Sequence, residues 1–414
     1  MSIDTRTPFE ADVPELPEGV PNVAEAVETI ASHLHPVASY DLAHHHVTTG
    51  LEEVWRFTPL KRLRGLLDSV GAPSGQLTWK VDGPDQVTTS RISKEEAIAL
   101  GGPAPVDRIA ALAVANATDA VRIDVPAEAE LDRPLIITLT GEGTSTPVFG
   151  HVVITVGAFA HATIVMEHRG SAVYASSVTL LVGDGATVSF TGLQLWADDA
   201  VHAGQVAIRV GRDAHVRTLS ATMGGDLVRL VETSEYAGPG GEAEQLGLYF
   251  VDAGQHFEHR LFVDHNQPHT KSNVDYRGAL QGRGAHSVWV GDVLIRKIAE
   301  GITTYESNRN LVLTDGCRAD SVPNLEIETG EIESAGHAST TGRFDDEQLF
   351  YLRSRGIDES EARRLVVHGF FADLIRRIGV PDVETRLLAA VEAELSVTVG
   401  VPSTFPETYE DVVS

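Results

Sequence analysis

Two short segments place histidine beside residues that could help it to bind a metal ion. Asp264, His265 and His269 occur together in DHNQPHTKS, and His337 lies among small residues in ESAGHASTTG. Imidazole nitrogen is a common metal ligand, and an uncrowded histidine can share a metal with a second chain. Pro268 disfavours helix at the residue before it, so the first segment is expected to form a hydrogen-bonded loop. The local sequence supports a surface hydrogen-bonding role for His337 at least as well as a metal-ligand role.

Motifs of the common enzyme classes are absent from the sequence. No lysine follows a glycine, which rules out a G-x-x-x-x-G-K-[ST] phosphate loop, and H-E-x-x-H, C-x-x-C and G-x-S-x-G do not occur. Gly282 and Gly284 form a G-x-G, but no third glycine follows at the spacing of a dinucleotide-binding turn. The histidine run at 44–46 has no carboxylate or thiol at a ligand spacing and is expected to be a solvated turn. The sequence therefore gives no support to the common hydrolytic routes.

The composition limits the classes of partner. The 414 residues include 59 Asp and Glu against 32 Lys and Arg, a formal net charge of -27. Such an excess repels phosphate backbones and anionic lipid surfaces, so no nucleic acid and no membrane is expected as a partner. The single cysteine, Cys317, rules out a disulfide framework or a four-cysteine cluster built by this chain alone, and is expected to pack as a small apolar residue. The first residues lack the basic and apolar parts of a secretory signal, so a cytoplasmic location is expected.

Strand-like sequence occupies the middle of the chain. From about Ala120 the apolar period changes to two, which is typical of strands. Short turns containing glycine recur within this region, with steps of 26 and 28 residues from Gly157 to Gly183 to Gly211. The spacing predicts a β-solenoid over 119–343, in which stacked coils share one apolar core.

The two ends of the chain have other patterns. Residues 1–20 are rich in proline and acidic residues and are expected to form a disordered leader, which a helical or mixed region follows over 21–118. Helical periodicity returns over 344–397, and an acidic tail follows over 398–414.

One helix of the C-terminal region has an unusually wide apolar face. Adjacent Phe370 and Phe371 point about 100° apart on a helix, which widens the stripe beyond what packing on one neighbour needs. The residues expected to contact a partner are Leu365, Val366, Phe370, Phe371 and Leu374. The alternative is an ordinary helical cap on the end of the solenoid.

Six sequence blocks, in order, resemble the SufB/SufD family of iron–sulfur cluster assembly proteins. Between about 120 and 378 they are HNQPHTKS from His265, YRG from Tyr276, SNRNL from Ser307, PNLEI from Pro323, GHASTTG from Gly336 and EQLFYLRSRGI from Glu347. The segment WRFTPL from Trp55 also resembles the W-R-Y-T-P-L segment near the N-terminus of SufD proteins. The resemblance implies a mainly β fold, a right-handed parallel β-helix flanked by N-terminal and C-terminal helical segments.

The resemblance also implies partners and a cargo. It implies that the chain pairs with SufB through its β-helix and binds the SufC ATPase through its C-terminal helices, which would assign the apolar face around Phe370 to SufC. It further implies that the chain alone holds no cofactor stably. Iron or a nascent iron–sulfur cluster would be held transiently in the complex, with His337 as a ligand shared with SufB.

Two blocks distinguish the branches of the family. Where SufB proteins carry a cysteine in T-Q-C-D-S, this chain has ESNRN from Glu306, and where SufB proteins read H-E-A-T, it has HAST from His337. Both differences resemble the SufD branch and imply a non-catalytic subunit of an ATPase-driven complex. SufD proteins commonly read C-S-H-G-A-T, whereas Ala335 stands where that cysteine would be, so its thiol is not available here.

A function of another class is compatible with a β-helix. The alternative is a polysaccharide-active enzyme, and glycoside hydrolysis needs two carboxylates that flank the scissile bond. No obvious carboxylate cluster occurs over 119–343, so the sequence favours an assembly protein. A third hypothesis is a scaffold that takes no part in cluster chemistry.

Overall fold

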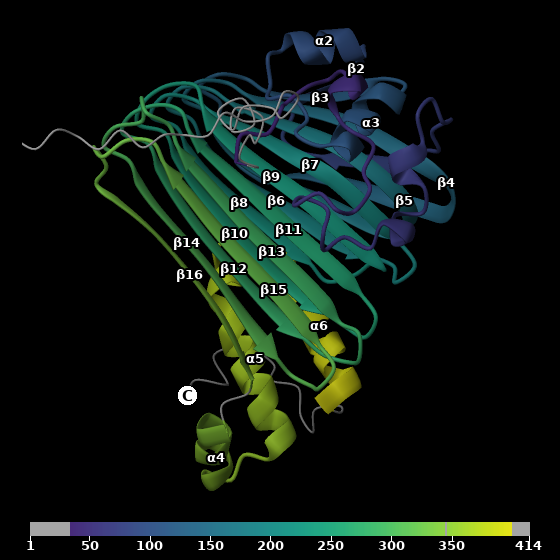
Figure 1. Ribbon diagram of the computed structural model, residues 1–414, viewed down its shortest axis with the longest axis vertical. Helices are drawn as coiled ribbons and strands as arrows, with labels where there is room; N and C mark the ends of the chain where they lie inside the picture. Colours follow the sequence, from purple (N-terminus) through teal and green to yellow (C-terminus); the bar gives the residue numbers. More distant parts are fainter. Residues whose placement is uncertain (1–33, 344–345, 400–414) are drawn as a thin grey trace, which may run out of the picture.

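The computed structural model describes residues 34–343 and 346–399 (Figure 1). The leader expected over 1–20, the start of the mixed region and the tail from residue 400 onward lie outside these ranges. Most of the described chain is a parallel β-helix, with helical segments before and after it (Figure 1). The fold class predicted from the sequence is confirmed.

Two rows of parallel strands build the β-helix. Strand β5 (His161–Val182) belongs to both, because its first half pairs with β6 and its second half with β7. Later strands alternate between the rows, so β7 to β15 pair by odd numbers and β6 to β16 by even numbers. Their bounds are β6 Thr187–Trp196, β7 Val201–Val210, β8 His215–Thr222, β9 Leu227–Tyr236, β10 Glu242–Val251, β11 His256–His265, β12 Lys271–Leu280, β13 His286–Ile295, β14 Thr303–Val312, β15 Arg318–Ile327 and β16 Ser334–Arg343.

The turns between strands explain the spacing of the glycines. Gly157, Gly183 and Gly211 lie in successive stacked turns, where each backbone touches the turn of the preceding coil. A Cβ on Gly183 would lie 2.5 Å from the amide nitrogen of Ala158, and one on Gly211 would lie 2.6 Å from the carbonyl carbon of Gly183. Glycine is needed there because any side chain would collide with the backbone of the preceding coil. The repeat length in the sequence is therefore the length of one coil.

Inward-facing aliphatic side chains fill much of the space between the two rows. Ile164, Leu180, Ile208 and Val263 are buried members of one continuous apolar cluster that runs along the β-helix. Alternate residues of a strand point to opposite faces, which is the origin of the period of two in the sequence. Cys317, in the turn before β15, packs partly buried against this cluster, as expected.

The N-terminal region adds short elements to the first coils. Strands β1 and β2 pair antiparallel with β4 and β3, respectively. The sequence did not predict β1 and β2, since most of their residues are exposed and they lack apolar alternation. The bounds are η1 Leu42–His44, η2 Leu60–Leu63, η3 Leu66–Asp68, β1 Thr78–Asp82, β2 Thr88–Ile92, α2 Lys94–Ala99, α3 Arg108–Asn116, β3 Ala120–Val125 and β4 Leu135–Val156.

Buried charges attach the WRFTPL segment to the β-helix. The indole of Trp55 lies 3.8 Å from the guanidinium carbon of Arg229, and Thr58 donates a hydrogen bond of 2.7 Å to Glu258. Arg229 also pairs with Asp107 at 2.6 Å, and Arg260 pairs with Glu258 at 2.5 Å. Burial by itself would raise the pKa of Glu258, but the neighbouring cationic groups lower it far below its usual range. Glu258 is therefore a buried anion that joins the two parts of the chain.

Three helices follow the β-helix (Figure 1): α4 (Asp346–Ser354), α5 (Glu359–Arg376) and α6 (Pro381–Val399). Asp358 caps α5, because its side chain accepts hydrogen bonds from the backbone amides of Ser360 and Glu361. Helices α5 and α6 pack their apolar faces against outward-facing residues of β8, β10 and β12. Within the described ranges, none of the helices has the length and apolar character needed to cross a membrane.

The packing of α5 corrects part of the predicted partner surface. Phe371 and Leu374 are both 0% exposed and belong to the cluster that includes Leu246 and Phe250 of β10. The prediction that these two side chains contact a partner is therefore wrong, because the chain's own sheet covers them. Three others of the predicted set, Leu365, Val366 and Phe370, are partly exposed.

Candidate functional site

The β-helix ends in an open coil formed by β15 and β16. These are the terminal strands of the sheet order, and no further strand pairs with either in the part of the chain that the structure describes. Most residues of β15 are half-buried and most of β16 are exposed. The outer edges of such strands carry backbone groups that can pair with another chain.

His337 lies on β16 at this open end. Parallel pairing sets it in register with Glu306 of β14, so the two side chains share one side of the sheet. The same row includes Asn310 and its register partner Thr341, whose side chains are 3.4 Å apart. The row faces the interior in the buried coils, and His337 is exposed because it belongs to the last described coil.

Glu306 is a buried carboxyl group directly behind His337 in the stack. It is 1% exposed, and neither carboxylate oxygen has a hydrogen-bond partner among the described residues. A Cβ on Gly291 of β13 would lie 2.7 Å from its Oε1, so the carboxyl occupies space that only glycine leaves open. Burial, and then the carboxylate of Asp292, raise the pKa of Glu306 to about 8. The group is therefore neutral at pH 7 in this state.

A hydrogen-bond network holds the strands around this position. Asn308 Nδ2 donates to the Tyr249 hydroxyl at 3.0 Å, and that hydroxyl donates to Asn310 Oδ1 at 2.6 Å. Asn310 Nδ2 and the Ser321 hydroxyl both donate to Asn308 Oδ1, at 2.8 Å and 2.7 Å. The SNRN block thus supplies buried amides that link β14 to β10 and β15.

The other predicted histidine segment forms a hydrogen-bonded loop, as expected. His265 ends β11 and its ring nitrogens bond to the hydroxyls of Thr270 (2.7 Å) and Ser272 (2.9 Å). Asp264 pairs with Arg296 at 2.7 Å, outside the interior. Burial lowers the pKa of His265 to about 4, so the ring is neutral and engaged with hydroxyl groups. The structure does not bring these residues to His337.

One histidine outside these segments lies beside two carboxylates. His35 Nε2 is 2.9 Å from Glu326 Oε1 and 3.8 Å from Glu328 Oε1. All three side chains are about one-third exposed, and groups of this kind are common without a metal. We assign the contact as a hydrogen bond that attaches His35 to the end of β15.

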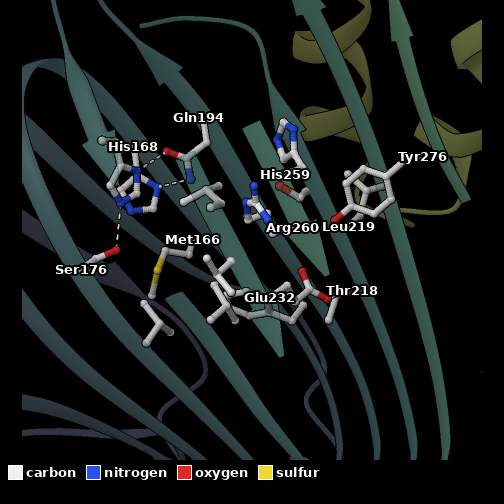
Figure 2. A pocket seen from close by; sticks show the side chains of 18 residues that line it. Met166, His168, Ser176, Gln194, Thr218, Leu219, Glu232, His259, Arg260 and Tyr276 are labelled. Carbon is white, nitrogen blue, oxygen red and sulfur yellow. Dashed lines mark hydrogen bonds between the residues drawn. The ribbon is translucent and has the colours of Figure 1, made fainter. Parts of the chain in front are cut away.

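A second polar cluster lies inside the β-helix, closer to its N-terminal end (Figure 2). The His202 ring bonds to Ser176 Oγ at 2.8 Å and to Gln194 Oε1 at 2.7 Å, while Glu232 accepts from Thr218 at 2.6 Å. Burial lowers the pKa of His202 well below its usual value and raises that of Glu232.

The cavity between these side chains is about 40 Å³, which is room for a few water molecules at most. This cluster was not predicted from the sequence. The available signal was polar residues at inward positions of the period-two pattern.

Helix α4 presents two exposed aromatic side chains. Phe350 and Tyr351 are 74% and 56% exposed, although they belong to the EQLFYLRSRGI block. They were not among the site residues predicted from the sequence. Their adjacency in a short helix, away from the apolar stripe of α5, was the signal that could have identified them.

Comparison with known proteins agrees with this architecture. Residues 137–370 match the family model described as SUF system FeS cluster assembly, SufBD core domain. The chain is 48% identical over 391 residues to an iron-sulfur cluster assembly SufBD family protein of Mycobacterium bovis, which covers 93% of this chain and 98% of that protein.

Two further relatives span different evolutionary distances. A SufBD family protein of Mycobacterium leprae is 49% identical over 367 residues, covering 87% of this chain and 94% of its own length. The assembly protein SufD of Bacillus subtilis is 25% identical over 296 residues, covering 70% and 67%. The family model matches more than half of this chain, and the mycobacterial relatives are matched over nearly their whole length. The chain therefore belongs to the SufB/SufD family of iron–sulfur cluster assembly proteins.

Proposed function

We propose that this chain is a SufD-type subunit that pairs with SufB, binds the SufC ATPase and contributes to cluster formation or iron acquisition without being an enzyme itself. The observation that carries the proposal is the position of His337, exposed on the last described coil where a second chain can reach it. Family membership supports assembly and leaves the polysaccharide-active alternative without a supporting observation.

Pairing with SufB is proposed to use the open end of the β-helix. The outer edges of β15 and β16 offer backbone groups for strand addition, and His337 lies in the middle of β16. The thiolates of a cluster would come from the partner, since Cys317 lies in the turn before β15 with its Sγ directed to Gly282 O at 3.3 Å. Iron is then a cargo held between two chains.

The contact with SufC is proposed to use the exposed aromatic residues of α4 together with the accessible part of α5. Phe350 and Tyr351 offer large apolar area to solvent, and aromatic side chains dominate many protein interfaces. Of the five residues predicted from the sequence, only the partly exposed Leu365, Val366 and Phe370 remain in this surface.

Co-purification of the full chain with SufB and SufC tests the subunit assignment. We expect a complex that contains all three proteins, measured by light scattering after size exclusion. His337→Ala should leave the complex intact and lower the amount of cluster formed, while His215→Ala, at an exposed histidine of β8, should change neither. Failure to associate with either protein would refute the assignment, and normal cluster formation by His337→Ala would remove that residue from the mechanism.

A separate comparison tests the SufC surface. Phe350→Ala combined with Tyr351→Ala should weaken SufC binding and leave SufB binding unchanged. Ile298→Ala serves as the control, because Ile298 is 62% exposed in a turn of the β-helix. Equal SufC affinity in the double variant and the control would show that α4 is not part of the interface.

A further inference from the structure

Two polar groups without partners meet at the last closed coil of the β-helix. Both oxygens of Glu306 and the Nε1 of Trp289 lack a hydrogen-bond partner within the described ranges, and both residues are at most 1% exposed. A Cβ on Gly291 would lie 2.7 Å from Glu306 Oε1 and 2.5 Å from Trp289 Cη2, so both side chains close over the same glycine. Buried polar groups are normally satisfied, and an orphaned pair in one place indicates a missing polar occupant.

The open end of the β-helix lies one strand away from this place. His337 is the register partner of Glu306 on the next and last strand, and neighbouring strands are about 4.8 Å apart. Its side chain belongs to the same inward-facing row and is exposed to solvent. An imidazole on the last strand and a carboxyl group on the strand before it therefore lie in the same row, one strand spacing apart.

The types of donor atom indicate the chemical class of the occupant. Imidazole and carboxylate together are a ligand set used for Fe²⁺ and related divalent ions.

We propose that Glu306 and His337 are the two ligands that this chain supplies to a divalent-cation site at the open end of the β-helix, with water or a partner chain completing the coordination. This rests on the proposed function, since it adds a second ligand to the histidine assigned there. Glu306 would enter the site as the deeper ligand, and Gly291 is required because a larger residue would displace its carboxyl group.

Titration of the full chain with Mn²⁺, followed by the loss of the free-ion EPR signal, tests the proposal. We expect saturable binding that Glu306→Gln and His337→Ala each weaken by at least about tenfold. Glu232→Gln is the matched control, because Glu232 is also a buried inward-facing carboxyl group but is hydrogen-bonded to Thr218 and Gln245. The control should bind Mn²⁺ like the wild type.

Far-UV circular dichroism and thermal unfolding establish that each variant is folded. If Glu306→Gln does not fold, Gly291→Ala replaces it, because the added methyl group displaces the carboxyl group and should weaken binding similarly. Normal Mn²⁺ affinity in the Glu306 or Gly291 variant, with weakened affinity in His337→Ala, would overturn this inference and leave the proposed function standing. Absence of saturable binding by the wild type would also overturn it, and co-purification with SufB and SufC tests the proposed function separately.

Discussion

Replacement of Glu258 by glutamine tests the view that a buried anion attaches the N-terminal region to the β-helix. Glu258 is 0% exposed, pairs with Arg260 at 2.5 Å, and lies 3.4 Å from Arg229 Nε. The amide of glutamine keeps the shape and can still accept the hydrogen bond of Thr58. The substitution therefore removes the charge and little else.

The expected loss follows from what remains around the two arginines. Removing one partner of a buried ion pair costs about 3–5 kcal/mol, because a charge is left buried without compensation. Arg229 retains its 2.6 Å pair with Asp107, so Arg260 is the main cation that loses its carboxylate. We therefore expect the lower part of the range, about 3 kcal/mol. For a chain of this length that corresponds to a Tm lowered by roughly 3–6 °C.

Thermal and urea unfolding of wild type, Glu258→Gln and a control check this magnitude. Glu53→Gln is the control, since Glu53 pairs with Arg56 on the surface and both side chains are over 40% exposed. The pKa of Glu258 is depressed in the fold, so its contribution is complete above the unfolded pKa and is lost as pH falls through the folded one. The difference between wild type and variant should thus be full at pH 7 and shrink in acid below about pH 4. A Tm equal to that of the control at pH 7 would refute the reasoning.

Three further outcomes are expected. Phe371→Ala should lower the free energy of unfolding by about 3–5 kcal/mol, because it removes a fully buried ring, whereas Phe350→Ala should leave that free energy unchanged. Urea unfolding of both variants checks this difference. Gly183→Ala should lower Tm, because its Cβ would lie 2.5 Å from the Ala158 amide nitrogen, and an unchanged Tm would contradict the stacking of the turns. Burial lowers the pKa of His259 to about 4, so the unfolded chain takes up its proton first and stability should fall between pH 6.5 and 4; a His259→Gln variant with the same pH slope would argue against this.

The β-helix was predictable because its signals are local. A period of two and a glycine turn every 26 to 28 residues depend on the strand geometry and on the length of one coil, both of which the sequence displays directly. Strands β1 and β2 were missed for the corresponding reason, since they are exposed and their pairing with β4 and β3 leaves no apolar period to recognise.

The partner surface was only half predictable. An apolar stripe shows that a helix buries one face, but it does not show what covers that face. The sheet covers Phe371 and Leu374, and Arg277 of β12 also fixes the helix by donating to Phe370 O at 2.9 Å. Contacts between residues more than 90 positions apart decided which side of α5 faces solvent.

One cysteine, a strongly acidic balance and a repeating strand pattern can be read directly from the amino-acid sequence, which also draws attention to His337. The place of Glu306, behind that histidine and opposite Gly291, is visible only in the folded chain, in a coil where register partners are 31 residues apart instead of 26 or 28. Coil length varies from turn to turn, so the stacking of distant strands, and with it the burial of each side chain, is set by the assembled coils and not by local spacing.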